Sequence, residues 1–271
     1  MEELEKDFLE GIKNGEFKIF IQPKFDVRTL MVVGGEALIR RVKNNEIIMP
    51  KFFIPEYEKT GIITRLNMFV FESICKKLKE LKDKGYRLIP ISINESAKDL
   101  YDENHISKLK HIMEKYEVNP SLIELELTET VVLEDIENAK EAEKKVHSLG
   151  CVVSMDDFGV GYSSFSMLRK IHIDVLKIDK SFSDEVLNDE RGKIILESII
   201  QMAKRLEIKT VAEGIETKEQ VEYLKNIGCD MVQGYYFEKP LTIEQFEEKY
   251  LLFLGPEQKN SWKKVKNMIL W

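Results

Sequence analysis

The chain has 271 residues, a length that suits either one large domain, such as a barrel, or two small ones. Hydrophobic residues make up 43% of it and charged residues 33%, which excludes disorder along most of the chain. The 41 Lys and Arg residues are outnumbered by 48 Asp and Glu residues and form no basic tract, so the net charge of −7 argues against nonspecific binding to a nucleic acid polymer.

The amino terminus, MEELEKDFLE, is acidic and lacks a basic region followed by an apolar one, so we expect no secretory signal. No run approaches the roughly 18 apolar residues that cross a bilayer, and we expect no membrane insertion. Cys75, Cys151 and Cys229 stand far apart without a CxxC or Cys/His cluster, which argues against disulfides and a structural zinc site. We therefore expect reduced, buried thiols in a cytoplasmic protein.

The first third of the chain predicts two helices and one hairpin. Residues 2–13 and 61–84 have helical spacing of their apolar residues. Residues 17–27 and 30–39 are strand-like runs joined by a short polar turn, so the two strands are expected to be antiparallel.

From about residue 85 onward, short β-branched apolar runs alternate with helical stretches, which is typical of repeated β/α units. One helix is expected to bury Ile195, Ile199, Met202 and Leu206. Eight strands interleaved with helices predict an α/β fold, a TIM-type (β/α)8 barrel with one irregular strand. Strands are expected at 87–93, 121–127, 150–155, 174–178, 208–212 and 229–232.

No linker or low-complexity segment divides the chain, so we expect one domain over residues 1–254. The tail, residues 255–271, is expected to form a terminal helix that docks on the domain, with a partner-binding appendage as the alternative.

Polar side chains end most of the apolar runs. A barrel gathers the carboxyl ends of its parallel strands at one rim, where barrel enzymes place their active sites. Although a lone acid at a strand end is usually a helix cap or a solvated residue, a set of them at one rim indicates a site. The residues at the ends of successive runs are Glu36, Asn94, Glu126, Asp156, Asp157, Lys177, Asp179, Glu213 and Gln233.

Several carboxylates in one cleft repel each other and need cations between them. Oxygen ligands from Glu, Asp and Asn suit Mg²⁺ or Mn²⁺, whereas zinc recruits His or Cys. The adjacent pair Asp156 and Asp157 suits a two-ion site of the kind that supports displacement at phosphorus. Lys177 is either a donor to the attacking water or phosphate, or a structural ion-pair partner.

Two further features carry less information. The segment DDFGVGYSS at residues 156–164 lacks the signature of a phosphate-binding loop, so we interpret it as a shaped loop over the metals. The four histidines, His105, His111, His147 and His172, do not end strands, and we assign none of them a catalytic role.

Together these motifs make the chain similar to a known family. From about residue 10 to residue 248 it resembles the EAL-domain family of cyclic-di-GMP phosphodiesterases. The motifs that carry the resemblance are IQP at 21–23, Glu36-Ala37-Leu38, FIPEYEKTG at 53–61, SIN at 92–94, ELELTE at 124–129, DDFGVGYSS at 156–164, LKID at 176–179, AEGIET at 212–217 and QGYYFEKP at 233–240.

The resemblance implies a barrel with one antiparallel strand and hydrolysis of cyclic di-GMP to linear pGpG with two Mg²⁺ or Mn²⁺ ions. It assigns Glu36, Asn94, Glu126 and Asp156 to one ion, with Asp156 bridging to a second ion that Asp157 also binds.

The resemblance also assigns roles to residues that are not metal ligands. Lys177 and Glu213 would hold or deprotonate the attacking water, and Gln233 would close the site from the last strand. Glu129 would steady the loop at 158–163. Substrate binding falls to Gln22, Leu38, Arg40 and Asp179, of which Asp179 is expected near the second ion.

The sequence departs from the family pattern at Arg41, Glu95, Val160 and Glu238. Val160 replaces the usual Thr of the loop, so we expect slower or more metal-dependent turnover, which restoring Val160→Thr would reverse.

Since every ligand position is intact, we expect an enzyme. One alternative is a catalytically silent domain that binds cyclic di-GMP or a protein partner, and the second is a barrel enzyme that stabilises an enolate on one metal. The resemblance implies a homodimer, and the few residues outside the match lead us to expect a stand-alone hydrolase.

Overall fold

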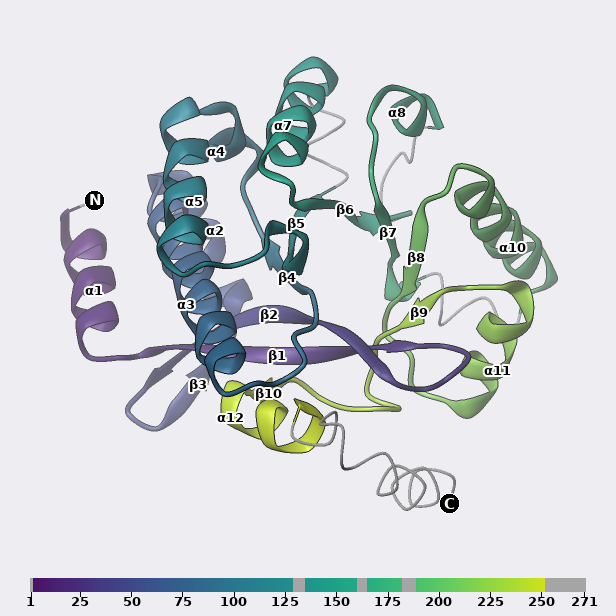
Figure 1. The fold of residues 1–271 in the computed structure, drawn as a ribbon, viewed down its shortest axis with the longest axis horizontal. Helices are drawn as coiled ribbons and strands as arrows, with labels where there is room; N and C mark the ends of the chain where they lie inside the picture. The colour runs from purple at the N-terminus through teal and green to yellow at the C-terminus, as the bar shows by residue number, and fades with distance from the viewer. Residues whose placement is uncertain (1, 129–134, 160–164, 182–188, 252–271) are drawn as a thin grey trace.

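A computed structural model describes residues 2–128, 135–159, 165–181 and 189–251. In these residues one sheet closes on itself into a barrel, with helices arranged around its outside (Figure 1). The barrel consists of β1 (Phe17–Asp26), β2 (Val32–Lys43), β4 (Ile91–Asn94), β5 (Ile123–Thr128), β6 (Val152–Phe158), β7 (Val175–Ile178), β8 (Lys209–Ala212) and β9 (Met231–Val232), with β3 (Glu46–Ile48) and β10 (Leu241–Thr242) at its edges.

Strand β1 is the antiparallel member of the barrel. It pairs antiparallel with β2, where Gln22 lies opposite Glu36, and with β9, where Phe25 lies opposite Val232. From β2 through β4 to β9 the neighbouring strands are parallel. The expected (β/α)8 barrel with one antiparallel strand is therefore confirmed.

The helices follow the strands in the order expected of β/α units. None of those the structure describes has both the length and the apolar character needed to cross a bilayer. They are α1 (Glu2–Lys13), α2 (Ile54–Thr60), α3 (Ile63–Asp83), α4 (Ala97–Tyr101), α5 (Glu103–Lys115), α7 (Ile136–Leu149), α8 (Phe165–Lys170), α10 (Glu190–Arg205), α11 (Lys218–Ile227) and α12 (Ile243–Phe246).

Alternation along the parallel strands separates an apolar outer face from a polar inner face. In β5, Leu125 and Leu127 belong to the main hydrophobic core between strands and helices, while Glu124 and Glu126 lie on the opposite face. In β7, Leu176 and Ile178 join that core, and Lys177 points the other way, into the barrel. The fold thus directs charged side chains into the barrel interior.

Element boundaries agree with the predictions to within a few residues, but the start of one strand and the buried face of one helix differ. Residues 87–90 of the first parallel run are not in a strand, because β4 begins at Ile91. The predicted buried face of α10 is wrong at Ile195 and Leu206, which are 50% and 48% exposed, and Met202 is only partly buried. Besides the correctly predicted Ile199, the buried residues of α10 are Leu196, Ile200 and Ala203.

Arg41, a departure from the family pattern, fastens α1 to the barrel. Its guanidinium pairs with Asp7 of α1 and lies 2.8 Å from the carboxylate of Glu16. It also lies over the ring of Phe17, 5.2 Å from the ring centroid. Phe17 belongs, together with Phe8 of α1, to a second apolar cluster. An arginine at this position therefore stabilises the docking of the amino-terminal helix.

The predicted thiol state agrees with the structure, since Cys75, Cys151 and Cys229 are all free and buried. The predicted end of the domain at residue 254 and the tail at 255–271 lie outside the described residues.

Candidate active site

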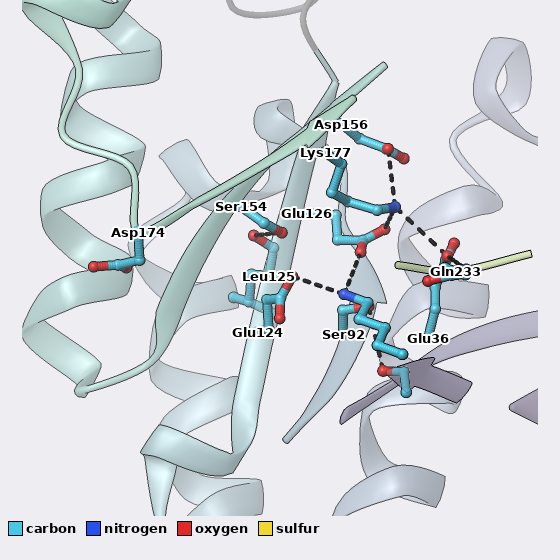
Figure 2. Close-up of polar contacts among 12 residues, drawn as sticks. Glu36, Ser92, Glu124, Leu125, Glu126, Ser154, Asp156, Asp174, Lys177 and Gln233 are labelled. Carbon is cyan, nitrogen blue, oxygen red and sulfur yellow. Dashed lines mark hydrogen bonds and ion pairs between the residues drawn. The ribbon is translucent and has the colours of Figure 1, made fainter. Parts of the chain in front are cut away.

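Lys177 of β7 lies at the centre of four carboxylates from four other strands or strand ends (Figure 2). Its side chain is only 1% exposed. The Nζ atom lies 2.9 Å from Glu126 Oε2 and 2.9 Å from Asp156 Oδ1. It also lies 3.0 Å from Glu213 Oε1 and 3.5 Å from Glu36 Oε2. The structure therefore brings together five of the residues that the sequence singled out.

The parallel register explains this convergence. Asn94 of β4 pairs with Glu126 of β5, and Thr128 of β5 pairs with Asp156 of β6, so the polar residues reach the same rim. Glu213 follows β8 directly and donates its backbone N–H to the carbonyl of Ile178 at the end of β7. The side chains meet because each strand ends at the same height in the barrel.

A second buried cation, Lys24 of β1, contacts the Glu126 carboxylate of the cluster. Its Nζ atom lies 2.9 Å from Glu124 Oε1 and 3.5 Å from Glu126 Oε1, and the residue is 1% exposed. Sequence reasoning missed Lys24. The available signal was its position two residues after Gln22 in an alternating strand, which places both side chains on the inner face.

The carboxylates outnumber these two lysines. Burial, only partly offset by Lys177, raises the pKa of Glu36 and of Asp156. Burial raises the pKa of Glu213 to about 8. Burial also opposes ionisation of Glu126, but both lysines act on it and its pKa is lowered. The cluster can therefore take up further positive charge.

Lys177 itself remains an ammonium group. Burial disfavours its charge, but the surrounding carboxylates, Glu126 and Glu36 foremost, raise its pKa well above the usual value. It can therefore donate hydrogen bonds and cannot serve as a base in this state.

A β-bulge shapes the acidic pair at the end of β6. The pairing with β7 shifts register between Met155 and Phe158, and Asp157 has a φ of 57°, in the left-handed region. The N–H of Asp157 donates to Asp156 Oδ1 at 2.9 Å. Burial and the nearby charge of Asp179 raise the pKa of Asp157. The bulge thus presents two adjacent carboxylates, with Asp179 beside the outer one.

Gln233 closes the cluster on the β9 side. Its Nε2 atom donates to Glu36 Oε2 at 2.6 Å and to Gln22 Oε1 at 3.3 Å. Its Oε1 atom is buried and has no hydrogen-bond partner among the described residues. Such an orphaned acceptor favours an additional cation or donor at this place.

The residues fit a pair of hard divalent cations. The donors are carboxylate oxygens and the amide of Asn94, and an excess of buried carboxylates surrounds two ammonium groups. Asn94 ends β4 with an exposed side chain, so it is available as a ligand at the rim. Glu36, Asn94, Glu126, Asp156 and Asp157 would hold the ions.

Two cavities flank the cluster. One of about 300 Å³ is lined by Gln22, Glu36, Glu213, Gln233 and Tyr235, among others. The other, of about 320 Å³, is lined by residues that include Asn94 and Thr128. Leu38 lines both cavities and so stands between them. Tyr235, 58% exposed, was not singled out from the sequence.

One predicted site residue, Arg40, does not contact the cluster. Arg40 follows Glu36 and Leu38 on the same face of β2, but its guanidinium donates to the carbonyl of Ile39 at 2.7 Å and contacts no member of the cluster. Glu129 and most of the loop at 158–163, including Val160, lie outside the described residues.

Comparison with known proteins gives the family. A family model described as the EAL domain matches residues 5–240. Signaling protein YkoW of Bacillus subtilis is 36% identical over 240 residues, which are 88% of this chain and 30% of that protein. Cyclic di-GMP phosphodiesterase NbdA of Pseudomonas aeruginosa is 31% identical over 247 residues, 91% of this chain and 32% of NbdA. The chain spans about a third of the length of these curated relatives.

Solved structures agree with this match. The PaMucR phosphodiesterase in complex with c-di-GMP superposes with a TM-score of 0.83 at 29% identity, covering 90% of this chain and 99% of that one. An EAL domain protein from Listeria monocytogenes EGD-e superposes with a TM-score of 0.79 at 31% identity, covering 91% and 97%. The chain therefore belongs to the EAL domain family of cyclic-di-GMP phosphodiesterases.

Proposed function

We propose that this chain hydrolyses cyclic di-GMP to linear pGpG with the help of two Mg²⁺ or Mn²⁺ ions, which lowers the cellular level of the dinucleotide. The observation that carries the proposal is the complete ring of strand-end carboxylates around Lys177. NbdA is named a cyclic di-GMP phosphodiesterase, and the PaMucR structure is a c-di-GMP complex, which supports the choice of substrate.

The two cavities suit a substrate with two equivalent halves. Each has a volume of about 300 Å³, the lower end of the range for small-molecule sites. Cyclic di-GMP would lie across Leu38 with one guanosine in each cavity and a phosphodiester above the carboxylates. Gln22, Arg40 and Asp179 complete the proposed substrate-binding set, with Tyr235 added as a stacking surface.

In the reaction, water attacks phosphorus, the P–O3′ bond breaks and the released 3′ oxygen takes up a proton. Bound divalent ions would neutralise the carboxylates, polarise the phosphodiester and acidify the attacking water. The Lys177 ammonium holds the water or a phosphate oxygen by donating hydrogen bonds. Glu213, whose Oε1 atom lies 3.0 Å from Lys177 Nζ, would accept the proton of the water in its ionised form, which the charge of the bound ions favours. Gln233 fixes the Glu36 carboxylate by its 2.6 Å hydrogen bond.

The alternative is a silent domain that binds the dinucleotide without cleaving it. The positions on which cleavage depends argue for the enzyme, because Glu36, Asn94, Glu126, Asp156 and Asp157 all retain oxygen ligands. Loss of one carboxylate would leave a binding site without the charge that holds two ions.

The test is turnover of cyclic di-GMP by the purified chain in Mg²⁺ or Mn²⁺, with the product resolved by chromatography. The control is Glu72→Gln, because Glu72 lies on the outer surface of α3, where it pairs with Lys115. Both wild type and this control are expected to make pGpG. Glu36→Gln and an EDTA-treated sample are expected to make none. Binding of the dinucleotide without cleavage in either metal would identify a receptor and overturn the proposal.

The expected cellular location and oligomeric state belong to the same proposal. Three buried free thiols are consistent with action in the cytoplasm. The homodimer implied by the family resemblance stays a prediction, which light scattering of the purified chain would test.

A further inference from the structure

A second cluster of potential ligands lies outside the barrel, at the other end of strands β6 and β7 from the candidate active site. Glu143 and His147 are one turn apart near the carboxyl end of α7, and His172 precedes β7. One ligand atom from each of the three residues lies within 4.8 Å of the others. The rings of His147 and His172 are 5.4 Å apart between centroids.

The orientation of His147 is fixed by a carboxylate on each side. Its Nε2 atom lies 2.9 Å from Asp174 Oδ2, and its Nδ1 atom lies 2.8 Å from Glu143 Oε1. Asp174 is itself anchored, because its Oδ2 atom accepts the backbone N–H of Val153 at 2.8 Å. Figure 2 shows Asp174 well away from the cluster around Lys177. With Nε2–H donated to Asp174, the Nδ1 atom faces Glu143 and can bind a cation.

We propose that Glu143, His147 and His172 form a binding site for a divalent transition metal ion such as Zn²⁺, with Asp174 orienting the His147 ring. Two imidazoles and one carboxylate are a ligand set that zinc favours over Mg²⁺. A carboxylate that accepts the far N–H of a metal-binding histidine is the usual outer-sphere partner of such sites. The site has three protein ligands and leaves a fourth position for water.

The surroundings of the His147 ring favour positive charge at the place where the ion would bind. Burial disfavours the imidazolium, but the hydrogen bonds to Asp174 and Glu143 raise the pKa of His147. A divalent ion would supply this positive charge by binding His147 Nδ1 and the Glu143 carboxylate, with release of any proton held between them. Among the described residues the exposed side chain of His172 forms no hydrogen bond or ion pair, so it can turn toward His147 without breaking one.

Closing the site requires only small movements. Tetrahedral zinc with bonds of about 2.0–2.1 Å places its ligand atoms roughly 3.4 Å apart, compared with the 4.8 Å limit seen here. Because Glu143 and His147 are already in contact across one helical turn, the adjustment falls on His172. The ion would tie the end of α7 to the segment entering β7. This proposal does not depend on phosphodiesterase activity.

The test is a Zn²⁺ titration by calorimetry with millimolar Mg²⁺ present to occupy the carboxylate rim. The variants are His172→Ala and Asp174→Asn, and the matched control is His111→Ala, which removes another exposed histidine on α5. Wild type and His111→Ala are expected to bind one more Zn²⁺ per chain than His172→Ala. Asp174→Asn is expected to weaken that site about 10–100-fold.

A second readout separates this site from the active site. Co²⁺ bound to the wild type is expected to give a tetrahedral visible spectrum that Glu36→Gln retains and His172→Ala loses, while circular dichroism shows that both variants are folded. Equal Zn²⁺ binding by wild type and His172→Ala, or a Co²⁺ spectrum lost only in Glu36→Gln, would overturn the proposal.

Discussion

Replacing Lys177 by methionine tests how the carboxylate cluster is held together. Its Nζ atom lies within 3.5 Å of four carboxylate oxygens and is almost fully buried. At an effective dielectric constant of about 20, each contact is worth roughly 5 kcal/mol before desolvation is subtracted. Removing one partner of a buried ion pair costs about 3–5 kcal/mol, because the opposite charge is left uncompensated.

That loss corresponds to a melting temperature roughly 6–20 °C lower in EDTA. In Lys177→Met the carboxylates that have lost their ammonium partner can bind protons, which reduces the loss of stability. Divalent ions supply the missing charge, so Mn²⁺ is expected to raise the melting temperature of Lys177→Met more than that of wild type. Turnover of cyclic di-GMP by Lys177→Met is expected to be lost in Mn²⁺, where wild type is active, since the ammonium donor is absent.

The assay is differential scanning fluorimetry or calorimetry with EDTA and with Mn²⁺. The control is Lys209→Met. In wild type the Lys209 side chain is 66% exposed and lies 3.0 Å from Asp230, so its removal should lower the free energy of unfolding by less than about 1 kcal/mol. A Lys177→Met protein that melts within about 2 °C of wild type in EDTA, a shift that corresponds to no more than about 1 kcal/mol, would show that this lysine does not balance the charge of the cluster.

Three further predictions follow from other parts of the structure. Folding raises the pKa of Glu213 from 4.5 to about 8, so its protonated carboxyl stabilises the folded protein; this contribution to the free energy of unfolding is fully present below pH 4.5 and is lost as pH rises through 8. The free energy of unfolding, measured with urea in EDTA at pH 5 and pH 8, should therefore depend less on pH in Glu213→Gln than in wild type. Tyr235→Ala is expected to raise KM for the dinucleotide about 5–100-fold by loss of a stacking surface, with little change in kcat, and steady-state kinetics in Mg²⁺ with equal effects on both constants would argue against this role. Arg41→Met is expected to cost about 1–2 kcal/mol by freeing α1 from the barrel, measured by urea unfolding, and an unchanged midpoint would show that the contacts to Asp7 and Glu16 do not hold the helix.

The sequence was sufficient for the barrel and for most of the site, because both depend on periodicity. Alternation in IELEL places Glu124 and Glu126 on one face of β5, and the parallel register then brings strand-end residues to one rim. These are local signals repeated from strand to strand. They predict which residues meet, although the distances among them needed the structure.

What sequence reasoning missed depends on contacts between distant segments. Lys24 reaches Glu124 across 100 residues, so no local pattern announces the pair. Glu95 departs from the family pattern, and its side chain is buried with its Oε1 atom 3.2 Å from Asn67 Nδ2. The face of α10 was misjudged because Ile195 and Leu206 satisfy helical spacing as well as Leu196 and Ile200 do. Tertiary packing selects between the two faces.

The proposed reaction depends on the binding of two divalent ions by strand-end oxygens at the rim of the barrel. The number of Mn²⁺ ions bound per chain, counted by electron paramagnetic resonance of the free ion, tests this dependence. The His172→Ala background keeps the separate histidine cluster from contributing. We expect about two ions per chain, fewer in Asp157→Asn and none in Glu36→Gln combined with Glu126→Gln. An unchanged count in that double variant, or no bound Mn²⁺ in its parent, would contradict this expectation.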